Sequence, residues 1–447
     1  MILRRIFTVL LLALTSVSWA SPEPFGSDFL AQERLFTIQG SNTIGAELGP
    51  ELVKRYLQAK GAERIQAKAS AENETLISAV IPASGQTVSV LVAAHGSGTG
   101  FKGLADGSAD IAAASRPAKD KEVASLRDLA DLRSAESEHI IGIDGLAIIV
   151  NQENPVSDLS VEEIAGIFSG AYKDWSELGG KTGPINVYAR DDKSGTWDSF
   201  ASMVLGERPL IASAKRFESN ADLSDHVSND VHGIGFVGLS SVRNAKLLSV
   251  SDGTAKSLIP NKLTVATEDY ALARRLFMYT DDQPANPYVA EFIAFALSND
   301  GQQTVADSGF ISQELKAVMP EFYAELPQDF RELTTDAQRL TINFRFQEGS
   351  AKLDNKALKD LERLVAYLGN HKGELVLVGF GDPKKTEKRS QLLSKLRAMA
   401  VRRELVRYGI YPAVSVGYGE NLPVASVNGQ EGRMKNRRVE VWVRVAS

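Results

Sequence analysis

The chain has 447 residues, of which 43% are apolar and 24% charged, a balance typical of globular proteins rather than disordered or fibrous ones. This length predicts two or three folded domains. The absence of cysteine excludes disulfides, thiolate metal sites, a cysteine nucleophile and a lipid-modified N-terminal cysteine, and no two of the five histidines stand at a zinc-ligand spacing. We therefore expect no metal and no other cofactor.

The first twenty residues are typical of a secretory signal peptide. Two arginines precede an apolar run from Ile6 to Leu14, and Ser18-Trp19-Ala20 places small residues at both positions that a signal peptidase reads. The apolar run is too short to span a bilayer of about 30 Å. We therefore predict a signal peptide at residues 1–20 and export of the remaining chain, without a membrane-spanning segment.

Charged residues divide the chain into two regions of opposite sign. Residues 338–447 contain 21 Lys and Arg against 11 Asp and Glu, a net charge of +10, whereas the rest of the chain has a net charge of −16. Between the two regions, Pro320 and Pro327 interrupt short helix-like segments. We predict one domain at residues 24–319, a linker at 320–337 and a second domain at 338–447.

Short apolar strands alternate with amphipathic helical segments in the acidic region, which predicts an α/β architecture. Three strands run directly into hydroxyl-rich turns that begin a helix: LFTIQ into GSNTIG (40–45), SVLVAA into GSGTG (96–100), and INVYAR into SGT (194–196). Because a helix start exposes unpaired N–H groups and a positive dipole end, it attracts anions. One such turn is also typical of an ordinary helix cap. Three of them, with Arg190 ending the third strand, indicate a shared oxyanion site.

The same segments resemble a known family. GSNTIG, GSGTGFKGLADGSADIAAASR, RDDKSGTWDSF and GIGFVGLS resemble successive signatures of periplasmic phosphate-binding proteins of the PstS type, and NPYVAEFIAFALSNDGQQTVADSGFI resembles their closing helices. The resemblance covers residues 35–312 and implies a two-lobed periplasmic-binding-protein fold of type II. It also implies that the chain leaves the first lobe near Ser115 to Ile143, returns near Leu239 to Leu248, and holds its ligand between the lobes.

The resemblance further implies the residues that contact phosphate. Some family members have an aspartate where Arg116 stands, and that aspartate accepts the remaining proton of hydrogen phosphate. Asp191 and Asp192 are alternative acceptors here, and phosphate and sulfate both stay open as ligands. The implied site consists of Ser41, Thr43, Ser97, Thr99, Ser115, Arg116, Arg190, Ser194, Gly195 and Thr196.

The basic region predicts a small α+β domain with a βαβαββ pattern, whose strands are LTINFRF, ELVLVGF, AVSVGYG and RRVEVWVRV. INFRFQEGSAKLDNKALKDLERL, VGFGD, LLSKLRAMAVRRELVRYGI and GRMKNRRVEVWV resemble the C-terminal OmpA-like domain. The resemblance implies capture of the diaminopimelate zwitterion of the peptidoglycan stem peptide by Asp382 and Arg397, although spacing alone also fits a surface ion pair. Phe380-Gly381 and the basic loop PKKTEKRSQ depart from the family pattern, which predicts altered affinity or selectivity.

Together these features predict an exported, non-enzymatic phosphate or oxyanion receptor tethered to the cell wall, in the periplasm and associated with the wall or outer membrane. It would serve phosphate capture or uptake with an ABC transporter permease. One alternative is a phosphatase-like hydrolase using the same cleft, although no GxSxG or HExxH motif occurs. The other is a structural envelope protein with a degenerate cleft. The excess of positive charge fits an anionic wall or outer-membrane surface better than nucleic acid.

Overall fold

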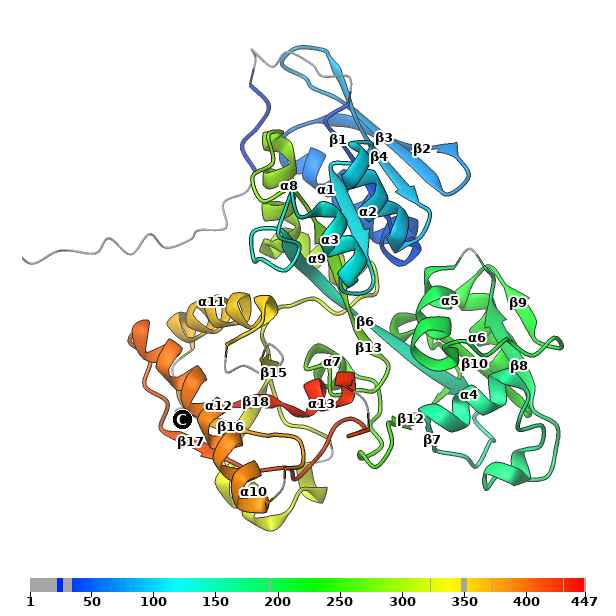
Figure 1. Ribbon diagram of the computed structural model, residues 1–447. Coiled ribbons are helices and arrows are strands. Elements are labelled where there is room, and N and C mark those ends of the chain that lie inside the picture. The colour runs from blue at the N-terminus through cyan, green and yellow to red at the C-terminus, as the bar shows by residue number, and fades with distance from the viewer. Residues whose placement is uncertain are drawn as a thin grey trace, which may run out of the picture.

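The computed structural model describes residues 22–26, 34–192, 194–321, 323–346, 352–371, 373–384, 386–428 and 430–445. The predicted signal peptide and its cleavage site lie outside these residues. In the part of the chain that is described, no helix combines the length and apolarity needed to cross a membrane. Figure 1 shows two α/β lobes joined by long strands and a third body formed by the C-terminal region.

The first lobe is built around parallel strands whose apolar runs are buried. β1 lies between β4 and β5, and the β2–β3 hairpin extends one edge of the sheet. Ile44, Leu48, Leu52 and Tyr56 recur every four residues along the helical segment after β1, and all four are fully buried. The elements are β1 (Phe36–Gly40), α1 (Gly49–Ala59), β2 (Glu63–Ala71), β3 (Glu74–Val80), β4 (Thr87–Ala94), α2 (Ser97–Asp106), β5 (Ile111–Ala114), α3 (Asp120–Leu126), α8 (Pro287–Leu297) and α9 (Asn299–Asp307).

The second lobe continues the same sheet in the order β6-β10-β8-β9, and a separate pair, β7 and β12, lies beside it. Stacked aromatic rings fill its core, where the centroids of Phe200 and Phe236 are 3.9 Å apart. The elements are β6 (Glu138–Val150), β7 (Asp158–Ser160), α4 (Val161–Ser169), β8 (Asn186–Arg190), α5 (Gly195–Phe200), β9 (Lys215–Phe217), α6 (Asn220–Asn229), β10 (Gly233–Gly238), β11 (Lys246–Leu247), β12 (Ser249–Ser251) and α7 (Lys262–Ala266).

Two strands are shared by the lobes. β6 pairs with β13 (Ala273–Tyr279) along its first half and with β10 and β11 along its second half. The expected departure from the first lobe is confirmed by β6, but the expected return between Leu239 and Leu248 is wrong, because that segment still pairs with the second-lobe end of β6. The chain returns later, through β13. Apolar patterning could not distinguish the crossing strands, since β6 and β10 are both almost wholly buried apolar runs and β13 is mostly buried.

The C-terminal region forms a five-stranded sheet in the order β14-β15-β18-β16-β17. Alternate residues of β16 face opposite sides, so that Leu375 and Leu377 pack under α11 and α12 whereas Val376 and Val378 pack with α10. The predicted α+β domain is confirmed, with β14 and α13 added. The elements are β14 (Ala317–Val318), α10 (Gln328–Leu333), β15 (Ala337–Arg345), α11 (Asn355–Asn370), β16 (Gly373–Gly379), α12 (Glu387–Arg407), β17 (Val414–Gly417), α13 (Gln430–Asn436) and β18 (Arg438–Val445).

The segment expected as a linker, 320–337, packs against this sheet. Phe330 is 1% exposed and its ring centroid lies 5.8 Å from that of Trp442 in an edge-on arrangement. β14, which precedes the segment, pairs with β15. We therefore propose a domain boundary between Ile311 and Ala317, earlier than the two prolines indicated.

A buried group of charged side chains joins the C-terminal region to the α7–β13 turn. We call these residues the interdomain charge cluster. Asp269 Oδ2 lies 2.6 Å from Arg339 Nη2, and Glu268 Oε2 lies 2.9 Å from Arg345 Nε. Burial alone would raise the pKa of Glu268, but the neighbouring arginines hold it far below its ordinary value. The cluster, each member less than a tenth exposed, consists of Glu268, Asp269, Arg339, Arg345, Arg438 and Glu440.

This cluster changes the interpretation of the basic C-terminal region. Three of its arginines face acidic residues of the first region instead of an outside surface. Part of the excess positive charge therefore neutralises buried carboxylates within the same chain. Buried charges without partners are strongly unfavourable, so the two regions are held in one arrangement.

Asp269→Asn is expected to destabilise the folded chain by about 3 kcal/mol, because it leaves the buried guanidinium of Arg339 without its closest compensating charge. The free energy of unfolding in guanidinium chloride measures this loss. Asp128→Asn is the matched control, since its side chain is 94% exposed. Equal unfolding midpoints for the two variants would show that the cluster contributes little to stability.

Candidate functional site

The turn after β1 (40–45) is held against the turn at the start of α2 (96–100) by hydrogen bonds from one backbone N–H group. Gly40 O and Asn42 Oδ1 both accept from Gly96 N, at 2.8 and 3.0 Å. Gly40 has a φ of 139°, and a Cβ there would lie 2.1 Å from Ala113 O. Only glycine fits this approach, which places the turn after β1 beside the start of α2.

The turn at the start of α2 (96–100) also contacts the end of β5. Ser97, the first residue of α2, accepts a hydrogen bond from Ser115 N at 3.2 Å through its hydroxyl oxygen. The hydroxyl proton of Ser97 stays available for donation. In contrast, Thr99 donates its hydroxyl proton to Gly96 O at 2.9 Å. Ser97 and Ser115 therefore lie together, as the family resemblance implied, while the hydroxyl of Thr99 is engaged locally.

The turn at the start of α5 (194–196), in the second lobe, contacts the turn after β1 in the first lobe. Thr43 donates its hydroxyl proton to Gly195 O at 2.9 Å, and Asn42 Nδ2 donates to Asp198 Oδ2 at 3.1 Å. A Cβ on Gly195 would lie 2.2 Å from Thr43 Cα. The two lobes are thus in direct contact at the place where the helix starts meet.

Two serines supply hydroxyl donors at this junction. Ser41 is 2% exposed, and its Oγ has no hydrogen-bond partner among the described residues. Ser194 caps α5 by accepting from Trp197 N at 3.3 Å, which leaves its own proton free to donate. Buried hydroxyls without partners are rare, so the hydroxyl of Ser41 is available to donate to a bound anion.

Arg190 stands at the end of β8, next to the start of α5. Its Nε donates to Phe217 O at 3.2 Å, its Nη2 donates to Glu218 O, and its Nη1 lies 3.4 Å from Thr196 Oγ1. Burial lowers the pKa of this guanidinium, although it remains a cation. The carbonyl contacts fix the guanidinium beside the hydroxyl-rich helix start.

Arg116 is placed differently from the other predicted site residues. Its Nη1 and Nη2 donate to the two carboxylate oxygens of Glu122 at 2.8 and 2.7 Å. Both nitrogens of the guanidinium fork are therefore paired with Glu122 in this arrangement. The alternative acceptor Asp192 is also turned outward, since it is paired with Arg216 and its side chain is 85% exposed.

The predicted wall-binding residues lie near each other in the C-terminal region. Asp382 is 3% exposed, and Arg397 Nη1 donates to Phe380 O at 3.2 Å, close to this carboxylate. Asp382 Oδ2 accepts from Lys384 Nζ at 2.7 Å, whereas its Oδ1 is buried without a partner among the described residues. Burial would raise the pKa of Asp382, but the hydrogen bond from Lys384 and its charge bring it below the ordinary value.

Comparison with known proteins agrees with both parts of this arrangement. A family model described as a PBP superfamily domain matches residues 56–300, and an OmpA family model matches residues 345–437. The chain belongs to the PBP superfamily. It carries a PstS-like domain followed by an OmpA domain.

Individual relatives support the same family. The phosphate-binding protein PstS of Staphylococcus saprophyticus is 32% identical over 237 residues, covering 50% of this chain and 72% of that protein. The PstS of Staphylococcus aureus strain USA300 is 32% identical over 226 residues, covering 48% and 67%. Among solved structures, a possible phosphate binding protein from Planctomyces limnophilus has 25% identity and a TM-score of 0.50, covering 62% of this chain and 92% of that one.

The PstS-like domain contains further site residues that sequence reasoning missed. Arg274 on β13 donates from Nη2 to Thr43 Oγ1 at 2.6 Å, and its Nε lies 3.3 Å from Asp144 Oδ2 on β6. Burial lowers the pKa of Arg274, while Asp144 opposes this shift, and burial raises the pKa of Asp198. No local motif marks Arg274, because it meets the first segment only through the pairing of distant strands.

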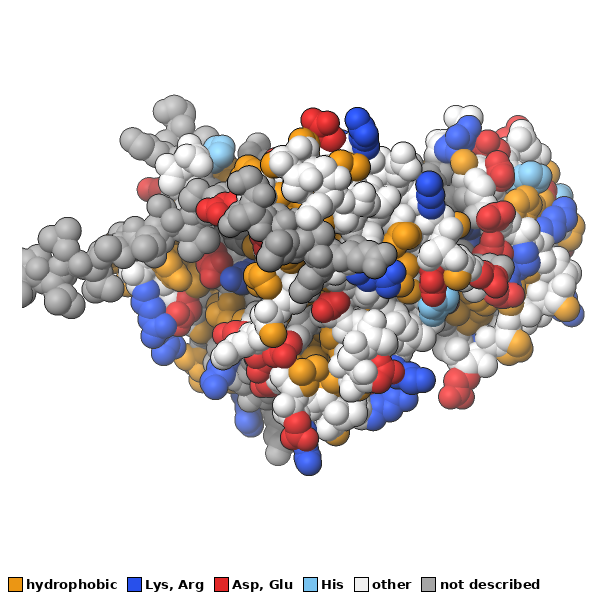
Figure 2. All heavy atoms as spheres, turned by 90° about the horizontal axis from the view of Figure 1, so that it is seen from above, with side chains coloured by type: hydrophobic (Ala, Val, Ile, Leu, Met, Phe, Trp, Pro, Cys, Tyr) orange, Lys and Arg blue, Asp and Glu red, His pale blue; other side chains and the backbone are white. Residues whose placement is uncertain are grey.

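On the face that Figure 2 shows, basic and acidic side chains of the described residues lie interspersed. An anion would therefore be recognised by short-range donors inside the junction rather than by the overall field. Among the residues that the structure describes, no group of three His, Asp or Glu side chains could hold a metal ion.

Gly195→Ala is expected to separate the lobes, because the added methyl group would overlap the backbone of Thr43. Gly98→Ala is the matched control: it lies in the first turn of α2, and a Cβ there meets nothing within 4 Å. The chain has no native cysteine, so spin labels at Lys102→Cys and Lys173→Cys can report the distance between lobes. A distance distribution unchanged by Gly195→Ala would contradict the close contact.

Proposed function

We propose that the PstS-like domain binds inorganic phosphate at the junction of its two lobes. The observation that carries the proposal is the meeting of four hydroxyl-bearing segments that lie far apart in sequence. One of them carries the buried hydroxyl of Ser41, which has no partner among the described residues. The proposed ligand residues are Ser41, Thr43, Ser97, Ser115, Arg190, Ser194, Gly195, Thr196 and Arg274. We propose that Thr99 and Arg116, whose polar groups have partners nearby in the chain, hold the segments that carry these residues. The names of the Staphylococcus relatives, which are phosphate-binding proteins, support the same ligand.

Binding without catalysis fits this junction better than hydrolysis. The Staphylococcus relatives are named as phosphate-binding proteins. A hydrolase needs an activated nucleophile or a base next to the anion. The hydroxyl proton of Thr43 is donated to a backbone carbonyl, and Ser194 serves as a helix cap, so neither contacts a general base. We therefore propose a receptor, and steady hydrolysis of a phosphate ester by the purified chain would contradict it.

Phosphate and sulfate can be separated by titration calorimetry. Hydrogen phosphate carries a proton that needs an acceptor, whereas sulfate only accepts hydrogen bonds. Asp144 and Asp198 both lie beside the contact of Thr43 with the second lobe, and either carboxylate could accept that proton. Phosphate binding that excess sulfate does not displace is the expected result, and equal competition would make the site a general oxyanion site.

Arg190→Ala is expected to weaken phosphate binding at least about tenfold, or about 1.4 kcal/mol, because it removes a charged fork from the anion. Arg208→Ala is a suitable control in the same lobe, since Arg208 pairs with Glu162 at the surface. Titration calorimetry at one salt concentration gives both dissociation constants. Equal affinity for the two variants would remove Arg190 from the site.

We further propose that the OmpA domain attaches the chain to peptidoglycan through Asp382 and Arg397. The ammonium of the stem-peptide zwitterion would replace Lys384 on Asp382, and its carboxylate would pair with Arg397. This attachment would hold the phosphate receptor at the cell wall or outer membrane in the periplasm, where it could deliver phosphate to an ABC transporter permease.

Sedimentation with purified peptidoglycan tests the attachment. Asp382→Asn is expected to weaken the binding free energy for peptidoglycan by about 2 kcal/mol, because the ligand ammonium would lose its charged partner. Lys384→Ala is expected to keep or strengthen binding, because it removes the side chain that already occupies Asp382. Lys388→Ala, at an exposed position of α12, is the matched lysine control and should not change it.

A purely electrostatic attraction to the wall makes the opposite forecast. It would weaken alike for both lysine variants, strengthen for Asp382→Asn, and fall steeply between about 0.15 and about 0.5 M salt. Asp382→Asn that sediments as well as the parent chain would therefore exclude the zwitterion pocket.

A further inference from the structure

The OmpA domain contacts both lobes of the PstS-like domain, on the side of β6 and β13 that faces away from α2 and α5 (Figure 1). At the first lobe, Asn355 Nδ2 donates to Glu138 Oε2 at 2.8 Å. At the second lobe, Ser426 N donates to Asp252 Oδ2 at 2.9 Å, and Lys256 Nζ lies 2.5 Å from Glu325 Oε2. The OmpA domain therefore bridges the two lobes across the strands about which they would bend.

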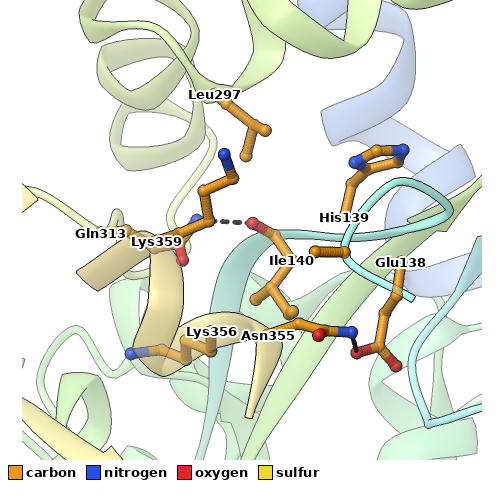
Figure 3. Close-up of a pocket in the computed structure, with 9 residues that line it drawn as sticks. Glu138, His139, Ile140, Leu297, Gln313, Asn355, Lys356 and Lys359 are labelled. Atoms are coloured by element: carbon orange, nitrogen blue, oxygen red, sulfur yellow. Dashed lines mark hydrogen bonds between the residues drawn. The ribbon is translucent and has the colours of Figure 1, made fainter. Parts of the chain in front are cut away.

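The contact with the first lobe is tightly packed (Figure 3). Asn355 at the start of α11 points toward Glu138. Arg363 of the same helix donates from Nη1 to Gln313 Oε1 at 3.0 Å, and Gln313 is itself bound to Ile140 O of the first lobe. The cavity that Asn355, Gln313 and Ile140 line measures about 10 Å³, which leaves room for one water molecule at most. A relative shift of the two bodies would break these hydrogen bonds, because their geometry tolerates only a few tenths of an ångström.

Two consecutive arginines of β13 connect the anion junction to this interface. Side chains of neighbouring strand residues point to opposite faces. Arg274 faces the junction, where it donates to Thr43. Arg275 faces the OmpA domain, where its Nη1 lies 2.9 Å from Asp354 Oδ2, and its Nε donates to Glu268 of the α7–β13 turn. A movement of β13 would therefore change both the contact of Arg274 with Thr43 and the contact of Arg275 with Asp354.

We propose that docking of the OmpA domain stabilises the closed arrangement of the two lobes and so increases the affinity of the PstS-like domain for phosphate. The inference rests on the proposed phosphate binding. The lobes are in contact in the same structure in which the interface is complete. An interaction made by only one of two lobe arrangements shifts the equilibrium toward it, and a ligand that needs this arrangement then binds more tightly. By linkage, phosphate stabilises the docked domain to the same extent.

Asp354→Asn removes one charge from this interface with little local damage. Asp354 caps α11 by accepting from Ala357 N, and asparagine caps a helix equally well. The variant is expected to raise the dissociation constant for inorganic phosphate at least threefold and to increase the open population measured by spin labels at Lys102→Cys and Lys173→Cys. Asp174→Asn is the matched control, because Asp174 caps a short helix at 175–178 in the second lobe.

A charge exchange at the surface provides a second test that does not threaten folding. Lys256 and Glu325 are 44% and 66% exposed. Glu325→Lys places two cations opposite each other across the interface, so it should weaken phosphate binding at least twofold. Adding Lys256→Glu to the same chain should restore the parent affinity.

The outcomes separate this inference from the proposed function. A full-length parent chain that does not bind phosphate contradicts the proposed function, and the lobe distances without ligand then decide the docking effect alone. A parent chain that binds phosphate, with Asp354→Asn and Glu325→Lys matching its dissociation constant and lobe distances, overturns the coupling. Weakening by Glu325→Lys that the exchange does not reverse would also count against it.

Discussion

The antiparallel pairing of β6 with β13 is the constraint on which the rest of the structure depends. It joins the two lobes into one continuous sheet and places Gly145 opposite Ala273 at the point where the lobes meet. A Cβ on Gly145 would lie 2.9 Å from Val265, so α7 can pack there only against glycine. Because neighbouring residues of a strand face opposite sides, this pairing sends one arginine to the anion junction and the next to the OmpA domain.

The proposed anion site at the lobe junction would let an acidic region accept an anion. Most of its donors are uncharged hydroxyls and backbone N–H groups at helix starts, which act over a few ångströms. Surface carboxylates farther away than about 8 Å are screened by salt. Arg190 and Arg274 add positive charge at the junction itself, and Asp144 balances the second of them. Local geometry, rather than net charge, therefore governs recognition.

The interdomain charge cluster gives the two domains a fixed relation that apolar contact alone would not specify. Arg339, Arg345 and Arg438 would be costly to bury alone, as would Glu268 and Asp269. The arginines of the OmpA domain therefore need the carboxylates of the α7–β13 turn, and the arrangement of the two domains in this structure pairs them. This cluster makes the C-terminal region part of the receptor's framework as well as a candidate anchor, because the α7–β13 turn that carries the acidic residues leads directly into the shared strand.

The sequence by itself determined the elements and the hydroxyl-rich turns. The spacing of Ile44, Leu48 and Leu52 specifies a helix because burial repeats with the helical period, and GSGTG specifies a helix start because of its turn and capping chemistry. Such signals lie within a few residues of one another. They sufficed to predict the α/β architecture, the two regions of opposite charge and the segments that form the junction.

Only the tertiary structure decided which of these local features meet. Arg116 stands in a motif that predicts an anion site, and in the fold its guanidinium pairs with the carboxylate of Glu122. Arg274 carries no motif and reaches Thr43 through strand pairing across more than two hundred residues. The two prolines predicted a linker, yet Phe330 within it is buried against the ring of Trp442. Partners of this kind depend on long-range packing, and packing is a property of the assembled chain rather than of any short segment.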